Sequence, residues 1–203
     1  GVKENKWNVY YSNGKKKAQG FFSEGFKNSF WKFYYCNGTL EQSGSYSNGR
    51  ENGEWNWYFE NGTLRKTENY YYGIKEGNYF EYDSLGNTIV KGYFTENMED
   101  GEWEVKIGDI VWKGFYIFWE LSGKVTSYYT NGNKFFEGEF LNGYQVGKHR
   151  YYYEDGSIKE EQIWESGVAT GTWKKYDDNG TVSITITYRD GKEYLINGIR
   201  LKY

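Results

Sequence analysis

Several residue types are scarce in this chain, and each scarcity excludes a class of structure or chemistry. The 203 residues include no proline, one cysteine (Cys36), one histidine (His149) and one methionine. A single cysteine cannot form an internal disulfide, and with one histidine it supplies too few ligands for a zinc site. The lack of proline is compatible with long sheets, because proline cannot donate a hydrogen bond to a strand ladder.

Long apolar runs and an excess of one charge are also missing. No segment approaches the roughly 20 apolar residues that a membrane-spanning helix needs. The formal net charge is -3, with acidic and basic residues interspersed. This balance gives no electrostatic footprint for nucleic acid or an anionic bilayer. We therefore expect no nucleic-acid partner, and we disfavour membrane attachment.

The compartment is left open by the sequence. The chain begins at Gly1 rather than Met. We expect either a cytoplasmic protein or one that is exported after removal of an N-terminal leader.

Glycine and aromatic residues are abundant and are arranged in a repeat. Aromatics make up 22% of the chain, and 27 residues are glycine. A unit of about 24 residues recurs about eight times. Its opening aromatic falls at Trp7, Trp31, Trp55, Tyr79 and Trp103, and the same slot is later held by His149 and Trp173. Such self-similarity predicts one linear domain over residues 1–203, with repeats over about 7–191 and a cap over 192–203.

Each unit is predicted to form a β-hairpin. In the second unit, two strand-like runs flank Asn37-Gly38, a pair that favours a two-residue type I′ turn. That turn predicts a register in which Cys36 lies opposite Thr39, Tyr35 opposite Leu40, Tyr34 opposite Glu41, Phe33 opposite Gln42, and Trp31 opposite Gly44. Between hairpins we expect five-residue turns with glycine at both ends, namely Gly49–Gly53, Gly73–Gly77, Gly143–Gly147 and Gly167–Gly171. The predicted fold is all-β: an elongated antiparallel β-meander solenoid with a C-terminal capping hairpin.

The predicted register distinguishes two faces of the sheet. The large ring at the opening slot lies across from a bare glycine, which we expect to admit the ring. The same pairing is predicted for Trp7 with Gly20, Tyr79 with Gly92, and Trp103 with Gly114. The opposite face, with Lys32, Tyr34, Glu41 and Ser43, is expected to face solvent.

The sequence offers no arrangement typical of catalysis. His149 occupies the aromatic slot, where packing across from Gln162 explains it, and an acid-base role would need a positioned partner. Cys36 has no neighbouring basic cluster to lower the pKa of its thiol. No phosphate-binding loop, nucleophile elbow or metal-ligand spacing is present. We therefore expect no enzyme activity, no catalytic residues, no cofactor and no metal.

Two groups of residues are candidates for binding a partner. The first is a column of tyrosines on the polar face, since exposed tyrosine is typical of binding surfaces. Its members are Tyr10, Tyr34, Tyr58, Tyr82, Tyr128, Tyr152 and Tyr176. The second is the irregular fifth unit, with candidates Trp112, Phe115, Phe118 and Trp119. The alternatives are that the tyrosines only fill gaps between strands, and that the fifth unit only repacks locally.

The tract Gly138-Glu-Phe-Leu-Asn-Gly143, followed by His149 and the turn at Gly156, resembles the MORN repeat. Units such as Gly53-Glu-Trp55-Asn-Trp-Tyr58-Phe-Glu-Asn-Gly62 are similar to the MORN-like variant of bacterial proteins named the YwqK family of antitoxins. The resemblance implies a β-hairpin solenoid used for binding, with no catalytic residues. The chain departs from the pattern where Asn97 and Trp119 replace the first turn glycine, and where the fifth hairpin is shortened around residues 106–110.

The preferred function is a non-enzymatic scaffold that binds another protein or a second copy of itself. A glycan-binding surface is the first alternative, because the many Trp and Tyr side chains could stack on sugar rings. Membrane-lipid attachment, implied by the resemblance to MORN proteins, is the second.

Overall fold

The computed structural model describes residues 4–201 and contains strands but no helix in that range. The all-β prediction is therefore confirmed. The described chain divides into two compact units, unit 1 up to Glu99 and unit 2 from Asp100. Residues 1–3 and the last two residues of the predicted cap lie outside the described residues, and the single domain over 1–203 stays a prediction.

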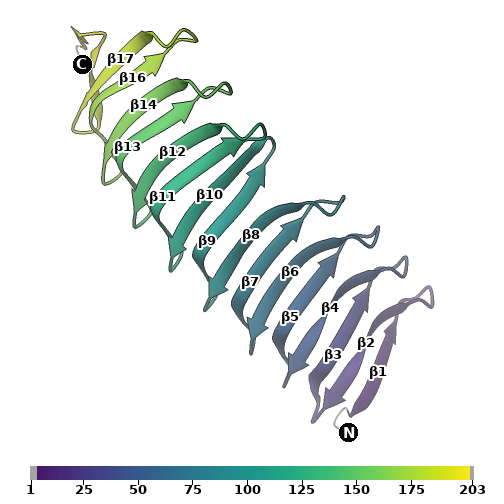
Figure 1. The fold of residues 1–203 in the computed structure, drawn as a ribbon. Coiled ribbons are helices and arrows are strands. Elements are labelled where there is room, and N and C mark those ends of the chain that lie inside the picture. Colours follow the sequence, from purple (N-terminus) through teal and green to yellow (C-terminus); the bar gives the residue numbers. More distant parts are fainter. Residues whose placement is uncertain (1–3, 202–203) are drawn as a thin grey trace. The chain divides into compact units, whose positions relative to one another are not determined.

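Unit 1 is an antiparallel meander in which each strand pairs with the next (Figure 1). Its strands are β1 (Asn5–Tyr10), β2 (Lys16–Ser23), β3 (Phe26–Tyr34), β4 (Leu40–Ser47), β5 (Arg50–Tyr58), β6 (Leu64–Tyr71), β7 (Ile74–Tyr82) and β8 (Thr88–Thr95).

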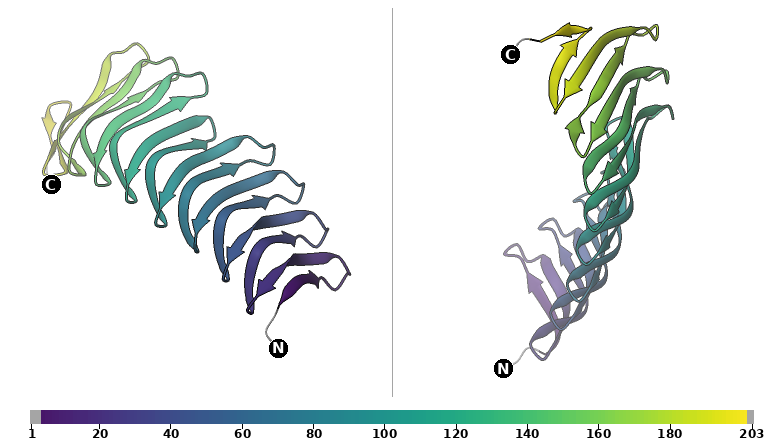
Figure 2. Two further views of the ribbon diagram at one scale, coloured as in Figure 1. Left: turned by 60° about the horizontal axis from the view of Figure 1, so that its bottom comes forward. Right: turned by 90° about the vertical axis from the view of Figure 1, so that its left-hand side faces the viewer.

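Unit 2 continues the same pattern of antiparallel neighbours. Its strands are β9 (Met98–Ile107), which begins two residues before the boundary, β10 (Ile110–Ile117), β11 (Glu120–Tyr129), β12 (Lys134–Leu141), β13 (Tyr144–Tyr152), β14 (Ile158–Glu165), β15 (Val168–Ala169), β16 (Gly171–Tyr176), β17 (Val182–Arg189), β18 (Lys192–Ile196) and β19 (Ile199–Arg200). Within each unit, the loops inside the hairpins, most of them the longer Asn-Gly or Asp-Gly loops, lie along one edge, and the turns between hairpins lie along the opposite edge (Figures 1 and 2).

The loops at Asn-Gly are longer than predicted. Around Asn37-Gly38, the Gly38 N–H donates to Tyr35 O at 2.9 Å and the Tyr35 N–H donates to Thr39 O at 2.9 Å. Of the two central residues only Gly38 has a positive φ, and Asn37 instead accepts the Thr39 N–H through Oδ1 at 2.8 Å. This geometry is a type I turn closed by a left-handed glycine, not the predicted type I′ turn.

The longer loop changes the predicted register near the tip. Trp31 lies opposite Gly44 and Phe33 opposite Gln42, as predicted, but Tyr34 pairs with Leu40, and Glu41 is left in a bulge. The predicted pairs Cys36–Thr39, Tyr35–Leu40 and Tyr34–Glu41 are therefore wrong. A bulge of one residue re-aims the side chain that it leaves unpaired.

The type I′ turns lie instead between the hairpins. Ser47 pairs with Arg50, and the two residues between them, Asn48 and Gly49, both have positive φ. The predicted five-residue turns are wrong, because the second glycine of each lies inside a strand, as Gly53 does in β5. Successive turns are linked through their backbones: Gly49 N–H donates to Lys27 O and Gly73 N–H to Glu51 O, both at 2.8 Å.

The two irregular hairpins of unit 2 follow the sequence prediction. Ile107 pairs with Ile110 around Gly108-Asp109, so the fifth hairpin has a two-residue loop and is shorter than the others. In the cap, Ile196 pairs with Ile199, and both Asn197 and Gly198 have positive φ. The same dipeptide, Asn-Gly, thus forms a type I′ turn here and a longer loop at Asn37-Gly38.

The core of unit 1 is a row of indole rings packed over glycines. Trp31 and Trp55 are each 2% exposed. Trp31 lies opposite Gly44 in the strand pairing, as predicted. The Trp31 ring, however, lies over Gly20 of the preceding strand, because a Cβ added at Gly20 would be 2.1 Å from Trp31 Cδ2. The glycine admits a ring as predicted, but it is the ring of the next hairpin.

A hydrogen bond explains this direction. The ring N–H of Trp31 donates to Phe21 O, ten residues earlier, at 3.1 Å. Trp55 repeats the bond to Ser45 O at 3.0 Å, and Trp173 repeats it to Ile163 O at 3.1 Å. His149 Nε2 lies 2.9 Å from Glu139 O in the same arrangement. The ring is held where both its apolar face and its polar N–H are satisfied.

One unit places Glu68 where most others have this glycine. Glu68 is 2% exposed, its Oε2 accepts the Tyr70 hydroxyl at 2.6 Å, and its Oε1 lies 2.9 Å from Lys75 Nζ. Burial raises the pKa of Glu68, but the hydrogen bonds from Tyr70 and Lys75, with the charge of Lys66, bring it below its ordinary value. Glu68 is therefore a buried but compensated charge.

The second face of unit 1 is less exposed than predicted. Ser43 and Thr67 are buried on it, at 5% and 8% exposure. The Thr67 hydroxyl donates to Asn56 Oδ1 at 2.7 Å. The expectation that this face is exposed to solvent is therefore wrong at Ser43, while Lys32, Tyr34 and Glu41 are half-buried.

Candidate functional site

The turns that follow β10, β12 and β14 place exposed apolar side chains along one edge of unit 2 (Figure 1). We call this group the apolar edge, and its members are Ile117, Phe118, Trp119, Leu141, Tyr144 and Val168. Gly143 N–H donates to Leu121 O and Gly167 N–H to Gln145 O, both at 2.9 Å, so the three turns are stacked. Exposed apolar groups that cluster in this way usually mark an interaction site.

The turn at Phe118-Trp119 is the strained part of the apolar edge. Phe118 and Trp119 have φ of 43° and 63°, in the left-handed region, where other turns on this edge place glycine at the second position. Bulky residues are uncommon in this region, and each costs about 1 kcal/mol or more. Their side chains are nevertheless 54% and 60% exposed. The turn therefore presents two large rings to solvent at a local cost in stability.

The structure separates the four candidates of the fifth unit. Trp112 is half-buried on the core face, where its Cη2 would be 2.4 Å from a Cβ added at Gly114 and its ring centroid is 6.1 Å from that of Tyr116. Phe115, on the other face of the same strand, is exposed. Only Phe118 and Trp119 belong to the apolar edge, and both are exposed as predicted.

Sequence reasoning missed Leu141, Tyr144 and Val168. Each flanks a two-residue turn, at Asn142-Gly143 or Ser166-Gly167. A signal was present, because these residues are apolar at the end of a hairpin where polar residues are common. The prediction of five-residue turns hides this signal, because it does not place these side chains beside the tip of a tight turn.

The tyrosine column contributes mostly half-buried rings. Tyr10 is exposed, whereas Tyr34, Tyr58, Tyr82, Tyr128, Tyr152 and Tyr176 are intermediate. The backbone carbonyls of Tyr34 and Tyr58 accept hydroxyls from Tyr11 and Tyr35, both at 2.7 Å. Those of Tyr152 and Tyr176 accept hydroxyls from Tyr129 at 2.9 Å and Tyr153 at 2.8 Å. The backbone of the column is thus part of the links between successive hairpins, whereas the role of its rings stays a prediction.

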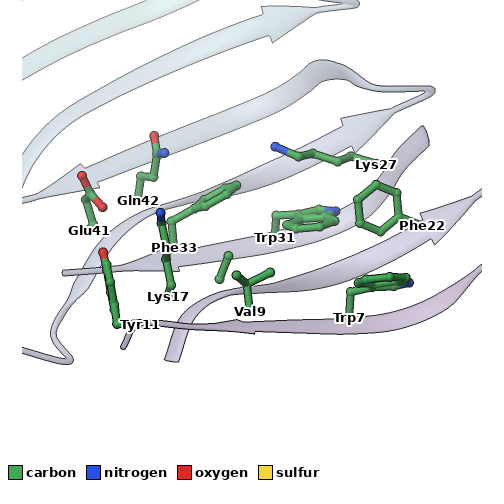
Figure 3. A pocket seen from close by; sticks show the side chains of 11 residues that line it. Trp7, Val9, Tyr11, Lys17, Phe22, Lys27, Trp31, Phe33, Glu41 and Gln42 are labelled. Atoms are coloured by element: carbon green, nitrogen blue, oxygen red, sulfur yellow. The ribbon is translucent and has the colours of Figure 1, made fainter. Parts of the chain in front are cut away.

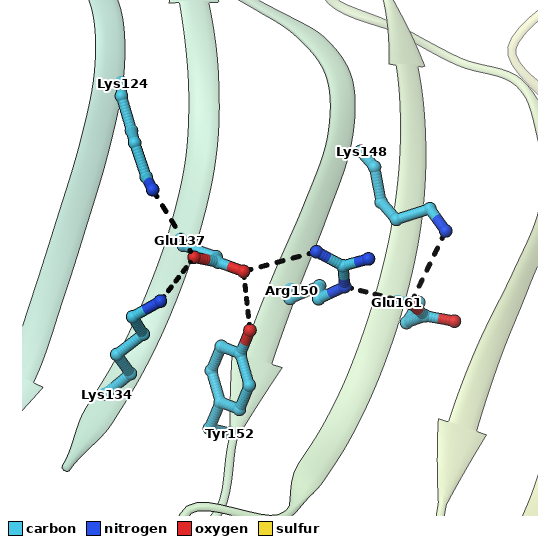
Figure 4. Close-up of polar contacts among 7 residues, drawn as sticks. All are labelled: Lys124, Lys134, Glu137, Lys148, Arg150, Tyr152 and Glu161. Atoms are coloured by element: carbon cyan, nitrogen blue, oxygen red, sulfur yellow. Dashed lines mark hydrogen bonds and ion pairs between the residues drawn. The ribbon is translucent and has the colours of Figure 1, made fainter.

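In unit 2 two hydroxyls of the column, from Tyr152 and Tyr176, belong to a network of charges. Figure 4 shows this network with Tyr152. Tyr152 donates to Glu137 at 2.6 Å and Tyr176 to Glu161 at 3.0 Å. Arg150 bridges the two carboxylates, at 3.2 Å from Glu137 and 3.0 Å from Glu161. Further cations contact the carboxylates: Lys134 at 2.7 Å and Lys124 at 3.8 Å from Glu137, and Lys148 at 3.6 Å from Glu161.

The network does not place a proton-transfer group near neutral pH. Hydrogen bonds from Lys134 and Tyr152 lower the pKa of Glu137 to about 2. Burial, with the hydrogen bond to Glu137, raises the pKa of Tyr152 to about 12. At neutral pH the carboxyl therefore stays ionised and the phenol stays protonated, so both act as fixed partners.

The two remaining reactive side chains, His149 and Cys36, lie in different surroundings. His149 is 1% exposed, lies opposite Gln162 as predicted, and its pKa is lowered by burial. Cys36 is a free, exposed thiol. Within residues 4–201, no group of three or more His, Cys, Asp or Glu side chains could hold a metal ion. Among residues 4–201 there is also no helix that is long and apolar enough to span a membrane.

Four segments match the family model of the MORN repeat variant: residues 51–70, 121–142, 145–165 and 169–190. These segments suggest a repeat-based interaction module. A search of curated proteins found no match.

Two solved structures share local similarity with the chain. One is a mutant of TarM from S. aureus, solved with fondaparinux, alpha-GlcNAc-glycerol and UDP, at 11% identity and a TM-score of 0.26, covering 58% of this chain and 19% of that chain. The other is the Tc holotoxin pore of Photorhabdus luminescens, at 13% identity and a TM-score of 0.21, covering 90% of this chain and 11% of that chain. The present chain thus spans a small part of either protein.

Proposed function

We propose that this chain is a non-enzymatic repeat scaffold that binds another protein, or a second copy of itself, through the apolar edge of unit 2. The observation that carries the proposal is the exposed Phe118-Trp119 pair in a left-handed turn. Backbone strain and exposed rings both cost stability, so their presence in one turn is typical of a functional site. The MORN-like segments support the same class of protein, because repeat arrays commonly present extended binding surfaces.

The energetics favour an apolar partner surface. Burial of a large aromatic side chain is worth about 2 kcal/mol, so the two rings supply a useful share of a micromolar affinity. The four other members of the apolar edge would extend the apolar contact from these rings along the next two turns. The partner would therefore offer a cavity or groove lined by apolar side chains.

The partner can be another protein or a second copy of this chain. The resemblance to the YwqK family supports one specific form of the first choice, in which the partner is a toxin that the chain neutralises. Membrane-lipid attachment has weaker support, because the net charge of -3 gives no attraction to anionic lipids.

The test exchanges the strained turn for the turn of the next hairpin. Phe118→Asn with Trp119→Gly copies Asn142-Gly143, so we expect unfolding free energy to rise by about 1–2 kcal/mol. Partners are captured by cross-linking from the native host and then purified, and self-association is measured by sedimentation velocity. We expect the double variant to weaken binding of the purified partner, or of a second copy, at least about 10-fold.

Tyr72→Asn is the matched control, because Tyr72 is an exposed aromatic at the first position of the equivalent turn of unit 1, with φ of 49°. It should leave the affinity unchanged. The proposal fails if the double variant is as stable as expected and binds as tightly as the parent chain.

A further inference from the structure

The first two hairpins of unit 1 form an open aromatic groove that no sequence prediction included (Figure 3). Its volume is about 430 Å³, within the usual range of small-molecule sites. Four rings lie along it, from Trp7, Phe22, Trp31 and Phe33. Trp7 and Phe22 pack edge to face with their ring centroids 5.6 Å apart, and Phe22 and Trp31 do so at 5.1 Å. These rings therefore form an apolar floor.

The groove exists because of a small residue at one repeat position. Ala18, which is buried, lies opposite Phe33 in the pairing of β2 with β3. One repeat later the same position is Gln42, opposite Trp57, and in unit 2 it is Phe136, opposite Tyr151. Ala18 leaves open the space that larger side chains fill elsewhere.

Polar side chains gather at the other end of the groove. Figure 3 shows Lys17, Glu41 and Gln42 beside Tyr11, away from Trp7. Lys17 and Glu41 are the residues left unpaired by the bulges of β2 and β4, which turn their side chains toward the groove. Within the described chain, the half-buried side chains of Glu41 and Gln42 make no hydrogen bond or ion pair, and the charge of Glu41 acts on the Tyr11 hydroxyl. Their polar atoms are therefore open to water or to a ligand in the groove.

We propose that this groove binds an uncharged saccharide. A sugar ring has an apolar C–H face and a rim of hydroxyls, so it matches aromatic rings next to donors and acceptors. Glu41 and Gln42 oxygens would accept from hydroxyls, and Lys17 and the Gln42 amide would donate to them. The lining carries two lysines and one carboxylate, and Lys27 already lies over the Trp31 and Phe33 rings at 5.1 and 5.0 Å. This mixed charge favours a neutral ligand over a strongly anionic or cationic one.

The probes are cellotetraose and chitotetraose, two uncharged linear oligosaccharides, titrated by calorimetry and by saturation-transfer NMR. We expect at least one to bind the intact chain. Ala18→Gln fills the groove with the residue of the next repeat and should raise the Kd at least about 10-fold. Gln42→Ala removes polar partners without filling the groove and should raise the Kd several-fold. Phe118→Asn with Trp119→Gly, far from the groove in sequence, should not change it.

Far-UV circular dichroism and Tm establish that each variant is folded. If Ala18→Gln does not fold, the Gln42→Ala result decides. The proposal is overturned if neither sugar binds, or if both groove variants bind like the parent. It is also overturned if anilinonaphthalene sulfonate, an apolar probe, binds the groove while the sugars do not, since the ligand would then be apolar. These outcomes do not depend on the apolar edge of unit 2.

Discussion

Units 1 and 2 differ in part at the opening slot of the repeat. Unit 1 has Trp31 and Trp55 there, whereas unit 2, which keeps Trp103 and Trp173, also has Val125 and His149. Trp31, Trp55, Val125 and His149 are all nearly fully buried. The glycine eleven residues earlier is kept in each case, although Val125 and His149 are much smaller than Trp. Another side chain must therefore fill the space that an indole would occupy at Val125 and His149.

The space is filled from the preceding strand. A Cβ added at Gly114 would meet Trp112 Cη2 at 2.4 Å, and one added at Gly138 would meet Phe136 Cζ at 2.7 Å. In unit 1 the positions of Trp112 and Phe136 hold Ala18 and Gln42. A large ring therefore lies over the glycine in each of these repeats, but it comes either from the opening slot or from the residue two places before the glycine. Trp112, in the apolar stretch of the fifth unit, fills the volume that an indole at Val125 would fill.

The opposite face shows a second contrast. Unit 1 buries the neutral side chains of Ser43 and Thr67, while unit 2 places Glu137 and Glu161 at the same repeat position and compensates them with Arg150 and lysines. The two units thus use neutral and ionic solutions at one place in the fold, and they should respond differently to acid.

The largest expected effect tests the glycine beneath the ring. Gly44→Ala would put a Cβ 2.2 Å from the Trp55 ring, which is held by its bond to Ser45 O. We expect a loss of about 3 kcal/mol in unfolding free energy, measured by urea denaturation.

Gly138→Ala is the matched change in unit 2. There the nearest atoms are the end of the Phe136 ring and His149, at 2.7 and 2.8 Å, so smaller shifts relieve the clash. We expect a loss of about 1–2 kcal/mol. Equal losses of unfolding free energy for Gly44→Ala and Gly138→Ala would contradict the inference that Phe136 fills the space of the missing indole in unit 2.

An intermediate effect is expected from the charged network. The folded pKa of Glu137 is about 2, below its ordinary value, so the unfolded chain takes up the proton first. The contribution of Glu137 is complete above about pH 4.5 and is lost as the pH falls toward 2. Glu137→Gln should cost about 1–2 kcal/mol at pH 7 and less at pH 3, as measured by urea denaturation at both pH values.

Ser43→Ala, at the equivalent position of unit 1, is the control for this change. Its effect should be the same at pH 7 and pH 3, since Ser43 does not titrate. A Glu137→Gln loss that is independent of pH would show that the carboxylate acts by packing alone.

The smallest expected effect comes from His149. Burial lowers its pKa below the ordinary value, although hydrogen bonds to the Glu139 and Val146 backbone oppose this shift. The unfolded chain therefore gains the proton first, and stability should fall as the pH drops below about 6.5. Between pH 7.5 and 5.5 we expect a loss of up to about 1 kcal/mol, visible as a lower Tm.

His149→Phe keeps a ring in the slot but cannot titrate. Its Tm should change less than that of the parent chain over the same pH interval. If both proteins lose the same stability, His149 is not the titrating group.

Much of the fold could be predicted, because repeated spacing constrains pairing. The hairpins, the pairs Trp31–Gly44 and His149–Gln162, and the shortened fifth loop all follow from the positions of rings and glycines. The turn types could not be predicted, because Asn-Gly is compatible with both loops. The Asn37 side chain selects the longer loop by bonding Thr39, whereas Asn197-Gly198 forms the tight turn.

The candidate sites depended on that choice. Exposure of Phe118 and Trp119 was predictable, since two bulky residues stand where a turn is expected. Leu141, Tyr144 and Val168 were not, because only the two-residue turns put them beside that pair. The groove over Ala18 required knowing which neighbouring ring covers which glycine.

By itself, the sequence determined the class of fold and the unit that repeats, because period-24 glycines and aromatics admit only a stack of hairpins. The tertiary structure decided which strand each ring covers, which loop is tight and where hollows remain. These depend on bulges and on contacts between hairpins, where a shift of one residue moves a side chain to another neighbour.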